Sequence, residues 1–349
     1  VERRDYVRAL SWLTVPGLLG PVMGPPVGGF ITTYFDWRYI FWINVPIGIV
    51  GFVLVTLYIA DFRAEEQKPL DRKGFLLSGI GLSGFVFGLA ASGIGLLTAG
   101  VEAVLIGGGA LFIALYLHHA LTVRDPLIDL RLLKITTYRT AILGGLVFRI
   151  GIGAMPFLLP LMLQLGFGLT AFQSGLLTFA SAAGAMAMKF AAPPILRRFG
   201  FRSVLVVNGV LSAGFIAVCG LFTPATPTAA IFALLIVGGF FRSLQFTAFN
   251  ALGFADVERD RMSQATSFSS VMQQVSVALG VSVAAFALDF GRAGHGGDLR
   301  LADFHLAFFV VAAISVTTIV FALLLPANAG AEVSGHGRSR DEQRPRPAE

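Results

Sequence analysis

Two arginines are the charged side chains best placed to do chemistry in this sequence. Arg149 and Arg242 each interrupt a long stretch otherwise free of Asp, Glu, Lys and Arg. A guanidinium in such apolar surroundings usually faces a bundle interior or a wet cavity. Arg149 is expected to bind an anionic or carbonyl group, or to be satisfied by helix carbonyls or an acid of another span. Arg242 lies closer to the end of its stretch, so a side chain that reaches the surface is favoured there.

Uncharged polar side chains in the same stretches form a second set. A hydrogen bond of this kind between membrane helices contributes only about 0.6 kcal/mol, so packing is the ordinary explanation for any one of them. Arg242, Gln245 and Asn250 lie close together on one segment, which favours a translocation path along this segment. The candidate residues of a translocation path are Arg149, Gln164, Arg242, Gln245, Asn250 and Gln273.

The 20 acidic residues supply no carboxylate deep within an apolar stretch. Glu102 and Asp289 come closest, at the ends of two stretches. A proton-coupled transporter needs a protonatable group inside the membrane, usually a carboxylate, so no proton-coupling residue can be named. Five scattered histidines and the single Cys219 give no metal-ligand spacing and no disulfide framework. We therefore expect neither a metal nor a cofactor.

The composition argues against an ordinary soluble enzyme. Of 349 residues, 55% are hydrophobic and only 13% are charged, against about 25% in soluble domains. One match to the dinucleotide fingerprint, Gly79-x-Gly81-x-x-Gly84, lies within an apolar run with no preceding strand, so its required context is missing. The sequence predicts an all-α, multi-pass membrane protein that is not an enzyme and has no nucleic-acid partner.

Ten stretches are long enough to cross a bilayer, which takes about 20 apolar residues. Two uncharged runs are too long for one crossing and contain glycine or proline breakers, so each is divided in two. The expected spans are 9–35, 39–60, 75–97, 103–122, 140–164, 172–191, 203–222, 229–252, 264–288 and 304–325.

Lysines and arginines segregate to one side of these spans. The loops and termini on that side carry 21 of them, and those on the other side carry three. By the positive-inside rule, both termini are expected to be cytoplasmic. The tail over 326–349 is polar and rich in Arg, Pro and Gly, which is typical of a disordered segment.

The first span carries a motif of small residues and prolines. Gly20, Gly24 and Gly28 share one helical face, so a neighbouring helix could approach closely there, and we expect Gly24 to be such a contact. Prolines bend the helix at the same place. The full motif consists of Gly20, Gly24, Pro25, Gly28 and Gly29.

This motif resembles the antiporter motif in the fifth span of drug:proton antiporters of the major facilitator superfamily, although Ser11 replaces a further glycine of that pattern. The segment from Asp36 to Gly48 is similar to the start of the sixth span in the fourteen-span branch. The segments 160–175 and 197–202 resemble its ninth span and the basic loop after its tenth. The ten expected spans would then correspond to spans five to fourteen.

The resemblance implies a domain organisation and a function. It places the remnant of the N-terminal half at 1–60, a linker with two extra helices at 61–139 and the six-helix C-terminal half at 140–325. It implies proton-coupled efflux of hydrophobic or cationic drugs across the bacterial cytoplasmic membrane, with lipid, substrate, proton and four missing N-terminal spans as partners. The chain by itself is then not expected to drive export. The alternatives are a scaffold-only or non-functional truncated protein, and a facilitator or importer of another solute.

Overall fold

Every regular element in the described part of the chain is a helix, as the apolar stretches predict. The computed structural model describes residues 23–59, 71–92, 97–123 and 126–336. A helix over 23–34 comes first. It is followed by α2 (Tyr39–Trp42), α3 (Asn44–Tyr58), α4 (Arg72–Ser92), α5 (Ala99–Thr122), η1 (Leu130–Lys134), α6 (Thr136–Leu161), η2 (Met162–Gly166), α7 (Ala171–Cys219), α8 (Thr228–Gly253), η3 (Arg259–Arg261), α9 (Met262–Ala293), α10 (Leu301–Val316), α11 (Thr318–Leu323) and α12 (Ala331–Ser334).

Eight helical segments in the described residues are long and apolar enough to cross a membrane. One of them, α7, has 49 residues, or about 74 Å at 1.5 Å per residue, which is more than twice the thickness of the hydrocarbon core. It breaks at Gly200, whose φ of 72° suits glycine. The helix therefore contains the two spans that the sequence predicts on either side of this glycine.

The break between the expected spans 172–191 and 203–222 comes later than the sequence predicts. Residues 189–199 continue the helix of α7, because the prolines at 193 and 194 do not end it and the break comes only at Gly200. Lys189 is consequently a helical residue, and its Nζ donates to Thr247 Oγ1 of α8 at 3.2 Å. The basic residues Arg197 and Arg198 lie on the last turn before the break.

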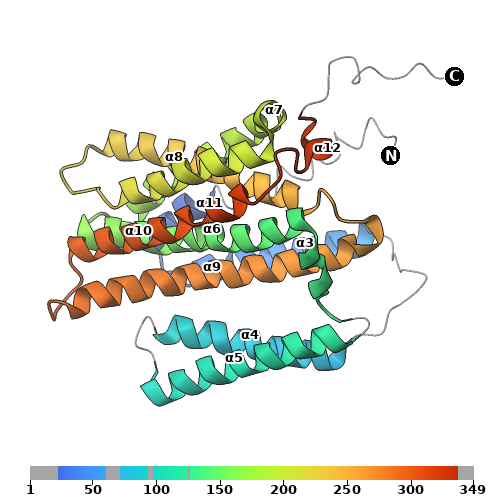
Figure 1. The fold of residues 1–349 in the computed structure, drawn as a ribbon. Coiled ribbons are helices and arrows are strands. Elements are labelled where there is room, and N and C mark those ends of the chain that lie inside the picture. Colours follow the sequence, from blue (N-terminus) through green and yellow to red (C-terminus); the bar gives the residue numbers. More distant parts are fainter. Residues whose placement is uncertain (1–22, 60–70, 93–96, 124–125, 337–349) are drawn as a thin grey trace.

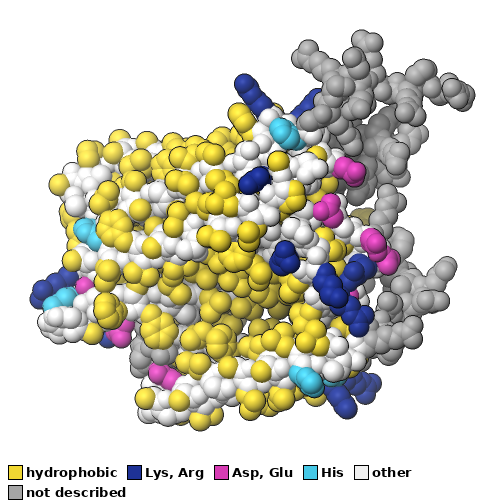
Figure 2. All heavy atoms as spheres, viewed as in Figure 1, with side chains coloured by type: hydrophobic (Ala, Val, Ile, Leu, Met, Phe, Trp, Pro, Cys, Tyr) yellow, Lys and Arg dark blue, Asp and Glu magenta, His cyan; other side chains and the backbone are white. Residues whose placement is uncertain are grey.

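The helices lie side by side in two parts (Figure 1). Helices α6 to α11 form the larger bundle, and the α4–α5 hairpin lies beside α9. The helix starts of α4, α6 and α9 are at one end of the molecule, where Lys and Arg side chains gather in Figure 2. We call this the basic end. Its described lysines and arginines are Arg72, Lys73, Arg131, Lys134, Arg139, Arg197, Arg198, Arg202 and Arg261, against Arg38, Arg292 and Arg300 at the other end.

Glycines allow the closest helix crossings of the larger bundle. A Cβ on Gly153 of α6 would collide with the backbone of Val277, and one on Gly280 of α9 would collide with the backbone of Ile150. A second pair, Gly184 and Gly239, brings α7 and α8 together in the same way. In a membrane the surrounding lipid is as apolar as the side chains, so the hydrophobic effect does not drive helices together. Close backbone packing of this kind stabilises their association instead.

The α4–α5 hairpin uses the same device. A Cβ on Gly81 would lie 2.8 Å from the Ile113 nitrogen, and one on Gly109 would collide with the backbone of Phe85. Gly81, which is part of the match to the dinucleotide fingerprint, therefore lies at a helix contact, as its apolar surroundings indicate. Helix α3, by contrast, has no buried residue among those described.

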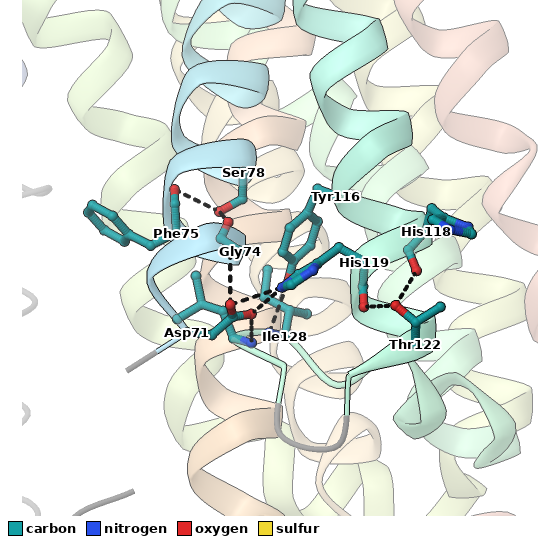
Figure 3. A network of polar contacts seen from close by, with 10 residues as sticks. Asp71, Gly74, Phe75, Ser78, Tyr116, His118, His119, Thr122 and Ile128 are labelled. Carbon is teal, nitrogen blue, oxygen red and sulfur yellow. Dashed lines mark hydrogen bonds and ion pairs between the residues drawn. The ribbon is translucent and has the colours of Figure 1, made fainter. Parts of the chain in front are cut away.

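A polar network fastens this hairpin at the basic end (Figure 3). The Asp71 carboxylate contacts His119 Nε2 of α5 at 2.9 Å and accepts from the N–H groups of Gly74 and Leu127. The Tyr116 hydroxyl accepts from the Ile128 N–H at 2.9 Å. Asp71 thus joins both helices of the hairpin to the segment that leads into α6.

Replacing Asp71 by asparagine is expected to lower the stability of the protein at pH 7. Burial raises the pKa of the Asp71 carboxyl, but the hydrogen bonds outweigh it and hold the pKa below its usual value. The charged carboxylate therefore stabilises the fold above about pH 4, and this contribution is lost as the pH falls through the lowered pKa. Hydrogen bonds to a charged group contribute about 1.5–3 kcal/mol.

Thermal unfolding in detergent measures this effect at pH 7 and at pH 3. The melting temperature of Asp71→Asn should fall by several degrees at pH 7, and its difference from wild type should shrink at pH 3. The matched control is Asp36→Asn, because the Asp36–Arg38 ion pair is solvent-exposed and contributes little. If the melting temperatures of Asp71→Asn and wild type differ by the same amount at pH 7 and at pH 3, the charge of Asp71 does not stabilise the fold as described.

Candidate functional site

A cavity of about 410 Å³ lies between the helix over 23–34 and helices α6, α7 and α8. Most of its lining is apolar. Pro156 and Pro160 of α6 contribute to the wall, and each lacks the N–H that would bond the carbonyl four residues earlier. The complete lining is Pro25, Ile152, Met155, Pro156, Leu159, Pro160, Thr178, Ser181, Ala182, Ala185 and Arg242.

Arg242 is the one charged residue that lines this cavity in the described part of the chain. It is half-buried, and its Nη2 donates to the Ser181 hydroxyl of α7. It lies eleven residues before the end of α8 at Gly253, which is about 16 Å along the helix. The expected reach to the surface is therefore wrong, because the guanidinium bonds across to α7 at mid-depth.

Arg149 is buried near the middle of α6, with 3% of its surface exposed. Its Nη2 donates to Asn250 Oδ1 at 3.0 Å, and its guanidinium carbon lies 5.6 Å from the centre of the Phe246 ring. The Nε and Nη1 atoms have no hydrogen-bond partner among the described residues. Among the described residues, neither a carboxylate nor a helix carbonyl accepts from Arg149, and Arg149 does not line the cavity, so both alternatives for it stay open.

Gln245 forms hydrogen bonds that join α8 to α7. Its Oε1 accepts from Asn208 Nδ2 at 2.9 Å, and its Nε2 donates to the Leu205 carbonyl at 3.0 Å. The side chain is fully buried between α8 and the second half of α7, away from the cavity. The three candidates on α8 therefore separate, with Arg242 at the cavity, Asn250 bound to Arg149 and Gln245 in the packing.

Gln164 and Gln273 are not brought to the cavity. Gln164 is half-buried in η2, and Gln273 is half-buried on α9. Neither is among the residues that line the space around Arg242. Their place in a translocation path stays a prediction.

The motif helix contacts the start of α7. A Cβ on Gly29 would lie 2.6 Å from the Ala171 carbonyl oxygen, and one on Gly175 would collide with the Pro25 carbonyl. Gly24 and Gly28 have no atom within 4 Å of such a Cβ among the described residues, and Gly20 lies outside them. Among the described residues this helix therefore meets α7 at Gly29, on a face turned by about 140° from that of Gly24, and the close contact expected at Gly24 stays a prediction.

Ser181 is the cavity residue that the sequence analysis missed. It lies three residues before Gly184, and on the facing helix Gly239 lies three residues before Arg242. Residues three apart share a helical face, so each helix presents one glycine and one polar side chain to the other. That matched spacing was the available signal.

Comparison with known proteins agrees with this architecture. The family model of the Major Facilitator Superfamily matches residues 1–281 and 141–347. A Salmonella paratyphi A protein named "Putative multidrug resistance protein MdtD" is 32% identical over 329 residues, which cover 92% of this chain and 69% of that protein. The Serratia proteamaculans protein of the same name is 35% identical over 289 residues, covering 81% of this chain and 59% of the relative.

The chain belongs to the major facilitator superfamily. The resemblance indicated by the motif in the first span is thereby confirmed. Members of the superfamily carry solutes across membranes between two helical halves, with the site near the midplane. In this major facilitator protein, the cavity lies beside the middle of α8, where Arg242 is, between the motif helix and the α6–α8 wall.

Proposed function

We propose that this major facilitator protein exports small apolar molecules, and that the cavity around Arg242 receives them. The observation that carries the proposal is a largely apolar cavity with one guanidinium at mid-depth, bounded on one side by Pro25 of the antiporter motif. Ligand sites typically combine an apolar lining with a few polar groups that fix orientation. The relatives named as multidrug resistance proteins support export as the direction.

The chemistry of the cavity narrows the substrate class. Arg242 and Ser181 are hydrogen-bond donors, and a guanidinium repels a cation in a low-dielectric site. Neutral or anionic apolar molecules with a carbonyl or carboxylate fit these donors better than cationic drugs. The cationic class that the family resemblance implies is therefore the less favoured one.

We propose that this export is coupled to the proton gradient. The described residues in the middle of the helices include no acidic side chain that could take up the proton. Every acidic residue that the structure describes lies in a loop or near the end of a helix. Asp303 is the most buried of them, and it caps the start of α10, where it accepts from the Arg300 N–H and contacts His295.

Efflux from bacterial cells that express the gene for this chain together with the four N-terminal spans that the resemblance implies tests the proposal. Cells are loaded with a neutral fluorescent dye and re-energised, and dye loss is followed with and without a protonophore. Export that the protonophore abolishes is expected. Downhill equilibration that ignores the protonophore would identify a facilitator instead. Equal dye loss in cells with and without the gene would contradict transport of this class.

A further inference from the structure

An apolar groove of about 620 Å³ separates the α4–α5 hairpin from α9. Figure 2 shows the hollow between these two parts, with hydrophobic side chains inside it. Leu82, Ser83 and Val86 of α4 form one wall. The face of α9 between Ser270 and Ala278 forms the other, and no charged residue lines the groove in the described part of the chain.

The groove continues into a second apolar cavity of about 220 Å³ toward the basic end. Leu82 and Val271 line both spaces, so the two are adjacent. Tyr116 and Ile128, which are joined by the hydrogen bond shown in Figure 3, form the wall of the second cavity at the basic end. The hairpin and the larger bundle thus enclose one elongated apolar space that is open at its side.

One helical face of α4 leads from this space to a positive charge. Arg72, Leu76, Gly79, Ser83 and Val86 are spaced by three or four residues, so they form a single stripe along the helix. A Cβ on Gly79 would meet no atom within 4 Å among the described residues, so the stripe is open at its middle. From Arg72 to Val86 the stripe is about 21 Å long.

Arg72 is exposed, and its side chain has no ion pair or hydrogen bond among the described residues. The neighbouring carboxylate of Asp71 is turned to His119 instead. On the opposite wall, α9 presents the exposed hydroxyl residues Ser263 and Ser267 in the turns before the groove. A cation and hydroxyls therefore mark the basic end of an apolar channel that is about as long as one leaflet is thick.

We propose that this groove binds one phospholipid, with its phosphate at Arg72 and one acyl chain between α4 and α9. The apolar lining matches an acyl chain, and the length matches one leaflet. The exposed guanidinium matches a phosphate, and basic sites between membrane helices favour anionic headgroups. The lipid would fill the space between the hairpin and the bundle, and this inference does not depend on what the protein transports.

Native mass spectrometry of the purified full chain, with dioleoylphosphatidylglycerol and dioleoylphosphatidylcholine added in turn, tests the site. Wild type should retain one phosphatidylglycerol molecule and prefer it to phosphatidylcholine. Ser83→Trp should fill the groove and reduce the retained lipid about tenfold, equivalent to about 1.4 kcal/mol. Val275→Trp fills it from the opposite wall, which keeps the test valid if one variant fails to fold. Val104→Trp is the matched control, because Val104 is 73% exposed on α5 and lines neither space.

The headgroup contact has its own pair of variants. Arg72→Gln should reduce the preference for phosphatidylglycerol about threefold to tenfold. Lys73→Gln makes the same change in charge on the next residue, about 100° around the helix, and should leave the preference unchanged. Equal losses from Arg72→Gln and Lys73→Gln would overturn the placement of the phosphate.

Three other results would overturn the groove as a lipid site. Equal retention by Ser83→Trp and Val104→Trp would place the lipid on the general surface. A wild-type dimer that Ser83→Trp dissociates would assign the groove to a second copy of the chain. A wild type that retains no phospholipid would show that another part of the protein covers it.

Discussion

Replacing Arg242 by methionine is expected to reduce export at least tenfold while the protein still folds. Methionine keeps most of the length of the side chain and its apolar stem, but it removes the one charged donor that lines the cavity in the described residues. Hydrogen bonds that involve a charged donor are about twice as strong as neutral ones. A tenfold change in rate corresponds to about 1.4 kcal/mol, which is within the range of a single bond of this kind.

Initial rates of efflux at several dye concentrations measure this effect. Arg242→Lys should retain partial activity, because it keeps the charge but lacks the planar set of donors. Ser181→Ala removes the residue that Arg242 bonds and leaves the guanidinium in the cavity, so it should change export less than Arg242→Met does. Wild-type efflux by Arg242→Met would remove this cavity from consideration as the substrate site.

Replacing Gly239 by leucine is expected to prevent folding. The added Cβ would overlap the backbone carbonyl of Ser181, which lies on the facing turn of α7. Backbone cannot move aside as a flexible side chain can, so α7 and α8 would have to separate. Overpacking of a well-packed core typically costs about 1–3 kcal/mol, and a collision with backbone belongs at or above the upper end.

The yield of monodisperse protein in detergent and its melting temperature measure the effect. Gly214→Leu is the matched control, because Gly214 also lies within a helix, is exposed and has no atom within 4 Å of an added Cβ among the described residues. It should be obtained in wild-type amounts. A Gly239→Leu protein that melts like wild type would show that the crossing of α7 and α8 is looser than described.

Features that depend on position along one helix follow from the linear sequence alone. The bilayer requires about 20 apolar residues for each crossing, so hydropathy is enough to locate the long helices. The acidic residues fall at helix ends because a charge deep in a span is costly, and their distance from the nearest loop can be counted directly. The motif in the first span depends on the spacing of five residues, and that spacing is enough to indicate the superfamily: Gly20, Gly24, Pro25, Gly28 and Gly29.

Which faces of these helices meet is a property of the tertiary structure. Arg242 bonds to Ser181 across 61 positions of sequence, and Gln245 bonds to Asn208 across 37. The two side chains lie on one helix but point to different neighbours, and their spacing of three residues could not reveal this. Gly29 rather than Gly24 meets α7 for the same reason. The rotation of each helix about its own axis is fixed by the joint packing of several distant segments, and no single segment carries that information.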